Sequence, residues 1–440
     1  MRRARIGALL ALVAPAACAP YLAPTASAPP ARDPQFRAPD SRTASPQRAG
    51  TRAASARAAD GALALPAHVD VVLGFLEDRP AIAWTDASNR QRTARTAGSG
   101  VSVDGAQPTT RVSVPGPVTI DERIYDGELL VTRHPEGGLR AIARVPLEAY
   151  VEGVVSSELA IWSASPAELE AQAIAARTFA VATLEQRREA GMRVRLTDGV
   201  LDQAFRGRFV HGNSAGARAA ARRLADAVRT TTGAVLVRGD RLEEARFHAA
   251  CGGRTAHFAD VFRREVVERG ARGPTSVACR PCADRARKES AAGAPDASRP
   301  LGWVVDLSEA TLAQIGRAFD LGGPPRGIVP ARIDDGGRWI DVALYDAKGR
   351  SKRVEFDALR RVVGYTELKS GVIAATLPRA GTALRGGPLR IQGRGRGHGV
   401  GLCQEGMRDL AAAGWTSAQI LALYYPGARI VRLQSAVPTG

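Results

Sequence analysis

Residues 165–184 read SPAELEAQAIAARTFAVATL, and this stretch fixes the start of a long helix. Ser165 is suited to the N-cap, Pro166 to the first helical position, and Glu168 completes a capping box. The apolar side chains that follow recur at helical spacing, at Leu169, Ala173, Ala176, Ala180 and Leu184. We therefore predict a helix that begins at Pro166 and ends near Gly191.

A second helix is predicted just before this one. Pro146 opens it, and its apolar face contains Leu147, Tyr150, Val151, Val154 and Val155. Between the two helices lies Glu158, in the sequence VVSSELAIW at 154–162. If its apolar neighbours also surround it in space, desolvation raises the pKa of this carboxyl group and keeps it protonated. A general acid that cleaves a glycosidic bond needs that property, although a Glu in a loop is more often solvated or capping.

The flanking sequence predicts a mixture of short strands and helices. Short β-branched runs broken by Gly, Pro and Asp predict strands at 69–75, 110–120, 127–145, 234–248, 302–307, 338–345 and 352–356. Further helices are predicted at 214–229, 404–413 and 416–424, and a polar loop at 283–300. We find no internal repeat, and this mixture of elements predicts an α+β fold.

The N-terminus predicts export. Basic residues precede an apolar run over Ile6–Ala17, which is typical of a signal over residues 1–18. Cys18 follows small residues as in a lipobox, and cleavage near 26–28 is the alternative. Residues 19–62 are rich in Ala and Pro and predict a disordered tether. We expect a protein of the periplasm or cell envelope that meets a membrane only through a lipid at Cys18.

The charge of the chain fits an anionic partner without identifying it. The 440 residues carry a net charge of +17, and 57 of the 61 basic residues are arginine, spread along the chain. Such a bias is also typical of GC-rich genomes. No zinc finger, helix-turn-helix or aromatic-basic stacking motif accompanies the charge, so we expect no nucleic-acid partner.

Several blocks of this sequence, in one order, resemble the SpoIID/LytB family. The family pattern reads approximately LEdYLxGVVxxEmP and then lkAQAVAARTYA, which is similar to residues 147–158 (LEAYVEGVVSSE) and 170–180 (EAQAIAARTFA). Further blocks are DQAFRG at 202–207, FHAACGGRT at 247–255, GRGRGHGVGLCQEGM at 393–407 and YYPG at 424–427. This chain departs from the pattern at Leu159-Ala160, where the family often has Met-Pro, and at Glu170, where it often has Lys.

The resemblance implies one SpoIID-like domain over residues 63–435, whose short strands and helices form a substrate groove. It also implies a peptidoglycan lytic transglycosylase that cleaves the MurNAc–GlcNAc bond and leaves 1,6-anhydro-MurNAc ends. Glu158 would act first as acid and then as base toward the C6 hydroxyl of the muramic acid. An intramolecular nucleophile needs no second carboxylate, and we expect Glu148 and Glu152 to be surface or capping residues. The expected substrate-binding residues are Gln172, Arg177, Gln203, His398 and Gln404. The alternative function is a glycan-binding enhancer of a partner amidase, of the LytB type.

Two pairs of ligand-type residues predict a metal site. His248-x-x-Cys251 and Cys279-x-x-Cys282 have the spacing of a tetrahedral structural zinc site, with His257 as an alternative ligand. A disulfide between Cys251 and one of the other two cysteines is the rival interpretation in an exported protein. The family resemblance favours zinc.

The last glycine-rich block predicts no nucleotide site. Residues 393–401 lack the Lys-Ser/Thr of a P-loop, and no strand–glycine–helix unit surrounds them. Their glycines are better suited to close approach of backbone to a polysaccharide. Cys403 stands where the family commonly has Ser, and we expect it to be a small buried residue.

Overall fold

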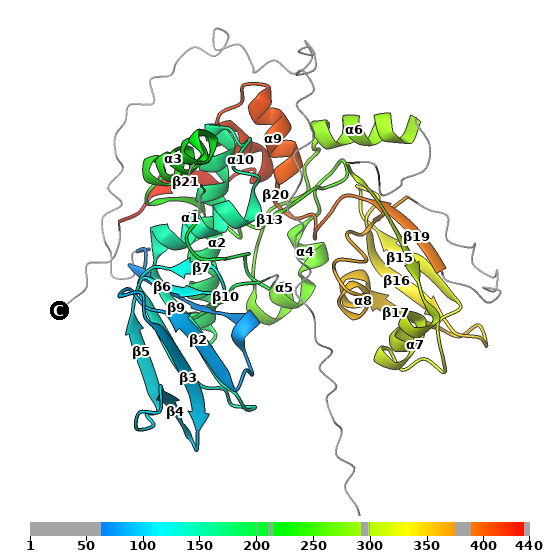
Figure 1. Cartoon of the computed structure of the whole chain (residues 1–440). Helices are drawn as coiled ribbons and strands as arrows, with labels where there is room; N and C mark the ends of the chain where they lie inside the picture. Colours follow the sequence, from blue (N-terminus) through cyan, green and yellow to red (C-terminus); the bar gives the residue numbers. More distant parts are fainter. Residues whose placement is uncertain are drawn as a thin grey trace, which may run out of the picture.

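The computed structural model describes residues 63–199, 201–209, 212, 214–291, 298, 300–374 and 389–434 (Figure 1). The predicted signal at 1–18 and the tether at 19–62 lie outside these residues. Among the helices that the structure describes, none combines the length and apolarity that crossing a bilayer requires. Helices and small sheets alternate along the chain, which confirms the α+β class.

Two five-stranded sheets form the N-terminal part of the fold. The first has the order β10-β1-β9-β8-β5 and consists of β10 (Leu196–Thr197), β1 (His68–Val72), β9 (Leu139–Pro146), β8 (Glu128–Arg133) and β5 (Arg111–Pro115). The second has the order β4-β3-β2-β6-β7 and consists of β4 (Gly100–Val103), β3 (Gln91–Ala97), β2 (Ala81–Thr85), β6 (Val118–Ile120) and β7 (Arg123–Tyr125). The pairs are antiparallel except for the parallel pairing of β1 with β10. Pairing of His68 with Pro146 joins β1 to the end of β9, directly before the first helix.

Helices α1 (Leu147–Glu158) and α2 (Pro166–Glu189) pack against the first sheet, and α3 (Ala215–Thr230) packs on α1 and α2. The start of α2 is as predicted, because the N–H of Glu168 donates to Oγ of Ser165 and the N–H of Ser165 donates to Oε1 of Glu168. One side of α2 joins the core of the sheets through Leu169 and Ala173. The other side joins a second core through Ile174. The small alanines of α2 thus allow it to be buried on both sides.

The second core lies between α2 and elements from the middle and the end of the chain. These are β11 (Ala234–Arg238), β13 (Phe247–His248), α6 (Arg280–Ala291), β20 (Leu402–Cys403), α9 (Gln404–Ala412) and α10 (Ser417–Tyr424). Strands β12 (Arg241–Leu242) and β21 (Arg429–Arg432) pair with β11 on either side. Strand β13 pairs in parallel with β20, which brings His248 beside Cys403. The prediction of a loop over 283–300 is wrong at its start, since α6 continues to Ala291. Its Ala, Arg, Lys and Glu residues favour a helix, and Cys282 and Glu289 anchor it in the interior.

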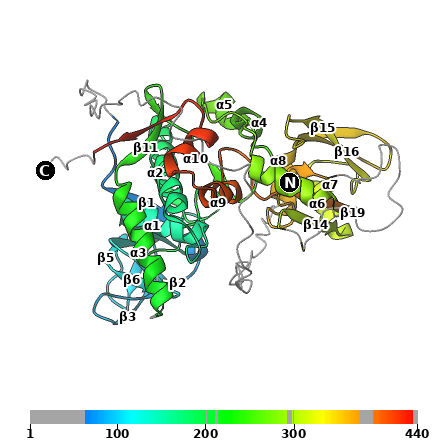
Figure 2. The same cartoon turned by 90° about the horizontal axis from the view of Figure 1, so that it is seen from above.

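A second lobe, residues 300–374 and 389–394, has a core of its own. It contains two three-stranded sheets and two helices: β14 (Gly302–Leu307), α7 (Glu309–Ala318), β15 (Gly327–Ile333), β16 (Trp339–Tyr345), β17 (Ser351–Glu355), α8 (Phe356–Val363), β18 (Val372–Ile373) and β19 (Leu389–Arg394). Figures 1 and 2 both show this lobe to one side of the sheets and of α1–α3. The short helices α4 (Phe258–Val261) and α5 (Arg263–Arg269) lie between the two parts.

Candidate active site and cysteine cluster

Glu158 is the last residue of α1, and its side chain is partly buried. Helix α1 ends there because Leu159 adopts an extended conformation, while its N–H still bonds the carbonyl of Val155. Oε1 of Glu158 accepts a hydrogen bond from the backbone N–H of Ala204 at 2.9 Å. The carboxyl group is therefore held by a segment that lies far from it in the sequence.

The segment that holds Glu158, residues 201–209, is itself fixed at two points. The Asp202 carboxylate pairs with Arg187 of α2 at 2.7 Å and accepts the N–H of Thr197 at 2.7 Å. The side chain of Gln203 accepts from the Tyr150 hydroxyl at 3.0 Å and donates to a backbone carbonyl of α2 at 3.3 Å. Because Gln203 directly precedes Ala204 and its side chain bonds both α1 and α2, the position of the Ala204 N–H is fixed.

Burial raises the pKa of Glu158 above its ordinary value. The hydrogen bonds from Ala204 and from the Gln404 side chain, and the charge of Arg206, lower that pKa but do not cancel the desolvation. Among the described residues, Arg206 is the charged group that acts on this pKa, and no carboxylate does so. Burial therefore shifts Glu158 toward its protonated form, in the direction that its apolar sequence context predicts.

Gln404 and Gln172 extend the contacts of Glu158 into the interior. Gln404 is the first residue of α9, and its Nε2 lies 3.4 Å from Oε1 of the fully buried Gln172 on α2. The amide nitrogen of Gln172 has no partner among the described residues. Of the five residues expected to bind substrate, these two lie around Glu158. Gln404 bonds the carboxyl group of Glu158, and Gln172 in turn accepts from the side chain of Gln404.

The expectation that Arg177 binds substrate is wrong in this structure, because its guanidinium is fully buried and already paired. It forms an ion pair with Glu148 at 2.5 Å and donates to the carbonyl of Ala234 at 3.0 Å. Glu148, expected to be a surface or capping residue, lies in the first turn of α1 and keeps one-third of its side chain exposed while it pairs with Arg177. This pair joins the start of α1 to α2 and β11.

Gln203 is also buried, and both its amide oxygen and its amide nitrogen bond protein groups, so the structure gives it a positioning role in place of substrate contact.

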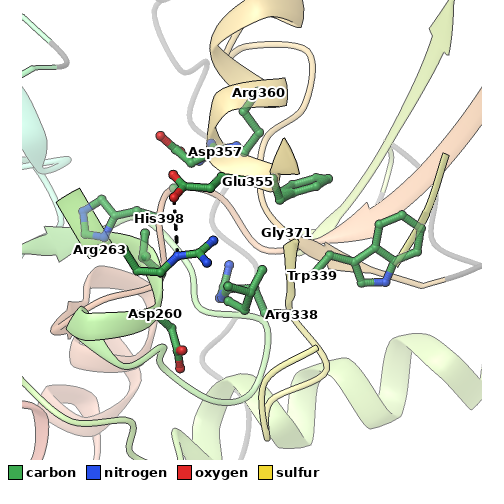
Figure 3. Close-up of a pocket in the computed structure, with 13 residues that line it drawn as sticks. Asp260, Arg263, Arg338, Trp339, Glu355, Asp357, Arg360, Gly371 and His398 are labelled. Carbon is green, nitrogen blue, oxygen red and sulfur yellow. Dashed lines mark hydrogen bonds and ion pairs between the residues drawn. The ribbon is translucent and has the colours of Figure 1, made fainter. Parts of the chain in front are cut away.

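His398 lies elsewhere, at a pocket between the second lobe and α4–α5 (Figure 3). Its Nδ1 accepts from the N–H of Val400 at 3.0 Å, and burial lowers its pKa well below the usual range. It also lines a cleft of about 840 Å³ that reaches Leu201 and Asp202, on the segment that holds Glu158.

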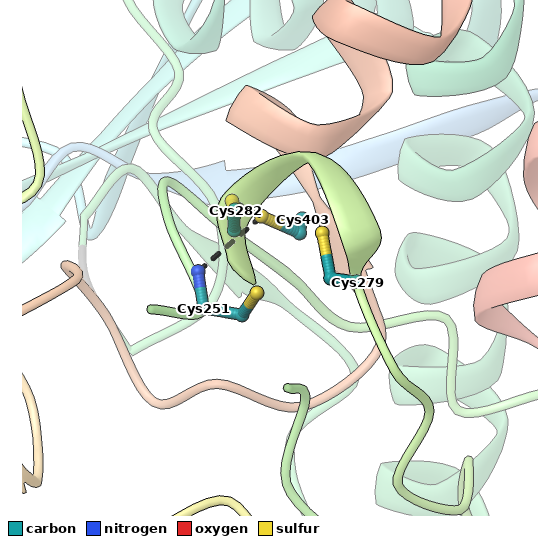
Figure 4. A group of neighbouring side chains, drawn as sticks. All are labelled: Cys251, Cys279, Cys282 and Cys403. Atoms are coloured by element: carbon teal, nitrogen blue, oxygen red, sulfur yellow. Dashed lines mark hydrogen bonds between the residues drawn. The ribbon is translucent and has the colours of Figure 1, made fainter. Parts of the chain in front are cut away.

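Four cysteines form a buried cluster: Cys251, Cys279, Cys282 and Cys403 (Figure 4). Their sulfur atoms all lie within 4.8 Å of one another, and none of the four is in a disulfide. The sulfurs of Cys282 and Cys403 are 3.6 Å apart. Tetrahedral coordination with Zn–S bonds of about 2.3 Å places sulfurs about 3.8 Å apart, so the spacing fits four thiolate ligands of one ion.

The surroundings of the cluster also suit thiolates. Backbone N–H groups of Cys251 and Gly406 donate to the sulfur of Cys403 at 3.3 and 3.4 Å. Hydrogen bonds from the other thiols lower the pKa of Cys279 well below its usual range, while burial raises the pKa of Cys251 and Cys403. Since ionising all four buried thiols requires a compensating charge, the cluster is suited to a cation.

The assignment of His248 as a ligand is corrected by this arrangement. Its Nδ1 bonds the carbonyl of Val400 at 3.1 Å, and its Nε2 has no partner among the described residues. His257, the alternative ligand, uses Nδ1 to accept from the N–H of Ser276 at 3.3 Å. Cys403 is the fourth member of the cluster. The sequence offered one signal for it, a cysteine where the family commonly has Ser.

Two comparisons with known proteins match this chain. Residues 135–237 match the family model described as SpoIID, Stage II sporulation protein. Stage II sporulation protein D of Bacillus subtilis (strain 168) is 25% identical over 297 residues, which cover 66% of this chain and 76% of that protein. The segment matched by the family model contains Glu158 and Ala204, whereas Gln404 and the four cysteines lie outside it.

Proposed function

Because the chain belongs to the SpoIID family, we propose that it acts on peptidoglycan as a lytic transglycosylase with Glu158 as its catalytic residue. Membership of the family supports a peptidoglycan-related function. The cleaved bond, the 1,6-anhydro product and the role of Glu158 are our proposal. The observation that carries it is a partly buried carboxyl group whose pKa is raised and whose Oε1 is fixed by Ala204.

The first step uses Glu158 as an acid. With Oε1 held by the Ala204 N–H, Oε2 carries the proton and donates it to the glycosidic oxygen between MurNAc and GlcNAc. The C1–O bond breaks, the GlcNAc strand leaves with the proton as a hydroxyl, and positive charge develops at C1 of the muramic acid. The Ala204 N–H, the Gln404 amide and Arg206 stabilise the carboxylate that remains.

The second step uses the same group as a base. The Glu158 carboxylate takes the proton of the muramic acid C6 hydroxyl, and this oxygen forms a bond to C1. The product is a 1,6-anhydro ring, and Glu158 regains its proton. Since nucleophile and electrophile belong to one sugar, the effective molarity is high and no activated water is needed. A mechanism with one carboxyl group is consistent with the surroundings of Glu158. Among the described residues, the charged group that acts on its pKa is Arg206, and no carboxylate does so.

We also propose that Cys251, Cys279, Cys282 and Cys403 hold a structural zinc ion. Four protein ligands leave no open position for water or substrate, so the ion would supply stability and take no part in the cleavage. It would tie the start of α6 to the N-terminus of α9. Because Gln404 follows Cys403 directly, the metal would also fix the amide beside Glu158.

Export and partners remain part of the proposal. A wall polymer is reached outside the cytoplasm, so we propose that residues 1–18 direct export and that the chain works in the periplasm or cell envelope, with a lipid at Cys18 as one form of attachment. The proposed partner is the glycan strand, after or together with a cell-wall amidase, and no nucleic acid.

Digestion of glycan strands freed of stem peptides separates cleavage from a binding role. We expect the purified protein alone to release fragments with 1,6-anhydro ends, detected by mass spectrometry. Glu152→Gln is the matched control on the same helix and should release them too. If fragments form only when an amidase is added to peptide-bearing wall, and never from bare strands, the chain is an amidase enhancer instead.

A further inference from the structure

Trp162 is exposed although it lies four residues after Glu158. Its side chain is 57% exposed, and it is the one aromatic residue among the large apolar side chains that the described residues expose. Trp84, Trp303 and Trp339 are at least 94% buried by comparison. Single exposed apolar side chains are common, and this one is of interest because it lies so close to Glu158 in the chain.

The backbone that carries Trp162 is fixed, so the ring is presented in one place. Ile161 anchors the turn in the core at 2% exposure. Arg223 of α3 donates to the carbonyls of Ile161 and Trp162 at 3.3 and 3.1 Å. Phe209 meets the indole in a T-shaped contact, with ring centroids 5.6 Å apart. A single contact of this kind covers at most one face of the indole and agrees with the high exposure.

One segment of chain contacts both Glu158 and Trp162. Ala204 bonds the carboxyl group, and Phe209, five residues later, contacts the indole. Trp162 lies four positions after Glu158, so their Cα atoms lie no more than about 14 Å apart. A short oligosaccharide bridges such a distance, which places the indole within reach of a glycan strand whose scissile bond lies at Glu158.

We propose that Trp162 binds the glycan strand by stacking its open face on a sugar ring beside the scissile bond. In β-1,4-linked GlcNAc and MurNAc the ring substituents are equatorial, so the axial C–H groups give each ring an apolar face. An indole covers such a face and excludes water from it. This inference rests on the proposed function, since it takes peptidoglycan glycan as the ligand, and Trp162 acts as a positioning residue.

Binding to bare glycan strands tests this inference separately from cleavage. The strands are titrated calorimetrically into Glu158→Gln, which binds without cutting, and into the same protein with Trp162→Ala or Trp162→Phe. We expect Trp162→Ala to weaken binding about tenfold and Trp162→Phe to keep it within about threefold. Ile333→Ala removes another exposed apolar side chain (50%), from the second lobe, and should leave the affinity unchanged.

Thermal melts show whether each variant is folded, and the exposed position of Trp162 predicts unchanged midpoints. In the active protein Trp162→Ala should raise KM for the strands more than it lowers kcat. Equal affinities of Glu158→Gln with and without Trp162 would overturn the stacking role, whether or not the wild type cleaves. If the strands bind and the wild type yields no anhydro ends, the proposed cleavage reaction is contradicted. The titration of Glu158→Gln with and without Trp162→Ala then still decides whether Trp162 stacks on the glycan. Absence of all strand binding contradicts both.

Discussion

The backbone N–H of Ala204 donates a hydrogen bond to Oε1 of Glu158 at 2.9 Å, across 46 positions of the sequence. This bond favours the ionised carboxylate, yet burial outweighs it and raises the pKa of Glu158. A site of this kind is ready to donate a proton and already has a donor placed for the charge that follows.

Glu158→Gln should stabilise the fold, and the gain should grow with pH. The pKa of Glu158 in the folded state lies above its ordinary value of 4.5, so between these values the folded state binds more protons than the unfolded state. The stability of the wild type therefore falls as pH rises through this window, whereas Gln does not titrate. Urea denaturation of both proteins from about pH 4 upward measures the difference.

The exposed Glu136 in the turn before β9 provides the control for this series, since Glu136→Gln should give the wild-type stability at each pH. A gain from Glu158→Gln that is constant across the range, or a loss that grows with pH, would show that burial does not raise the pKa of this group.

Gln404→Ala should lower kcat and move the alkaline limb of its pH profile upward. The Gln404 hydrogen bond lowers the pKa of Glu158, so without it the acid form persists to higher pH. The loss in kcat should be roughly fivefold, equivalent to a hydrogen bond of about 1 kcal/mol. Gln314→Ala, whose amide bonds the carbonyl of Val362 in the second lobe, is the control. A downward shift of the limb would contradict the contact.

Arg177→Met should destabilise the protein without impairing substrate binding. The substitution removes a fully buried guanidinium and leaves the Glu148 carboxylate without its ion-pair partner. We expect the free energy of unfolding to fall by about 3 kcal/mol. This is the lower end of the range for broken buried ion pairs, because Glu148 is one-third exposed. Arg188→Met, at an exposed position of the same helix, should change it by less than about 0.5 kcal/mol. A raised KM with unchanged stability would restore Arg177 as a substrate contact.

Cys403→Ser should lower the zinc content of the purified protein, whereas His248→Asn should keep about one ion per chain. The sulfur of Cys403 lies within the four-cysteine cluster, and no nitrogen of His248 belongs to that cluster. Metal analysis measures the content, and the absorption of the cobalt-substituted protein reports four thiolate ligands. Full zinc content in Cys403→Ser combined with loss in His248→Asn would support the ligand set that the sequence spacing suggests.

Local signals in the sequence predict the helices around the site well. The start of α2 is determined by the capping box of Ser165 and Glu168 and by Pro166 at the first helical position, all within four residues. Strand β14 occupies the predicted residues 302–307, where it pairs along its whole length with β19. The helix α6 is missed because Gly, Pro and Ser after residue 292 dominate the composition of that stretch.

The site residues that sequence reasoning misses depend on distant parts of the chain. Cys403 reaches Cys282 across 121 positions through the packing of α6 on α9, and no spacing rule covers that distance. Arg177 is buried because Glu148 lies one helix away, which turns a polar residue of a family motif into an internal ion pair. Trp162 carries no local signal, since exposure follows from the tertiary structure alone.

The most direct test of the account is digestion of bare glycan strands in ¹⁸O-labelled water by the wild type and by Glu158→Gln. One carboxyl group acting as acid and then as base, with the sugar's own C6 hydroxyl as nucleophile, predicts 1,6-anhydro ends without ¹⁸O from the wild type and no new ends from the variant. Reducing ends that carry ¹⁸O, or anhydro ends that persist in Glu158→Gln, would contradict it.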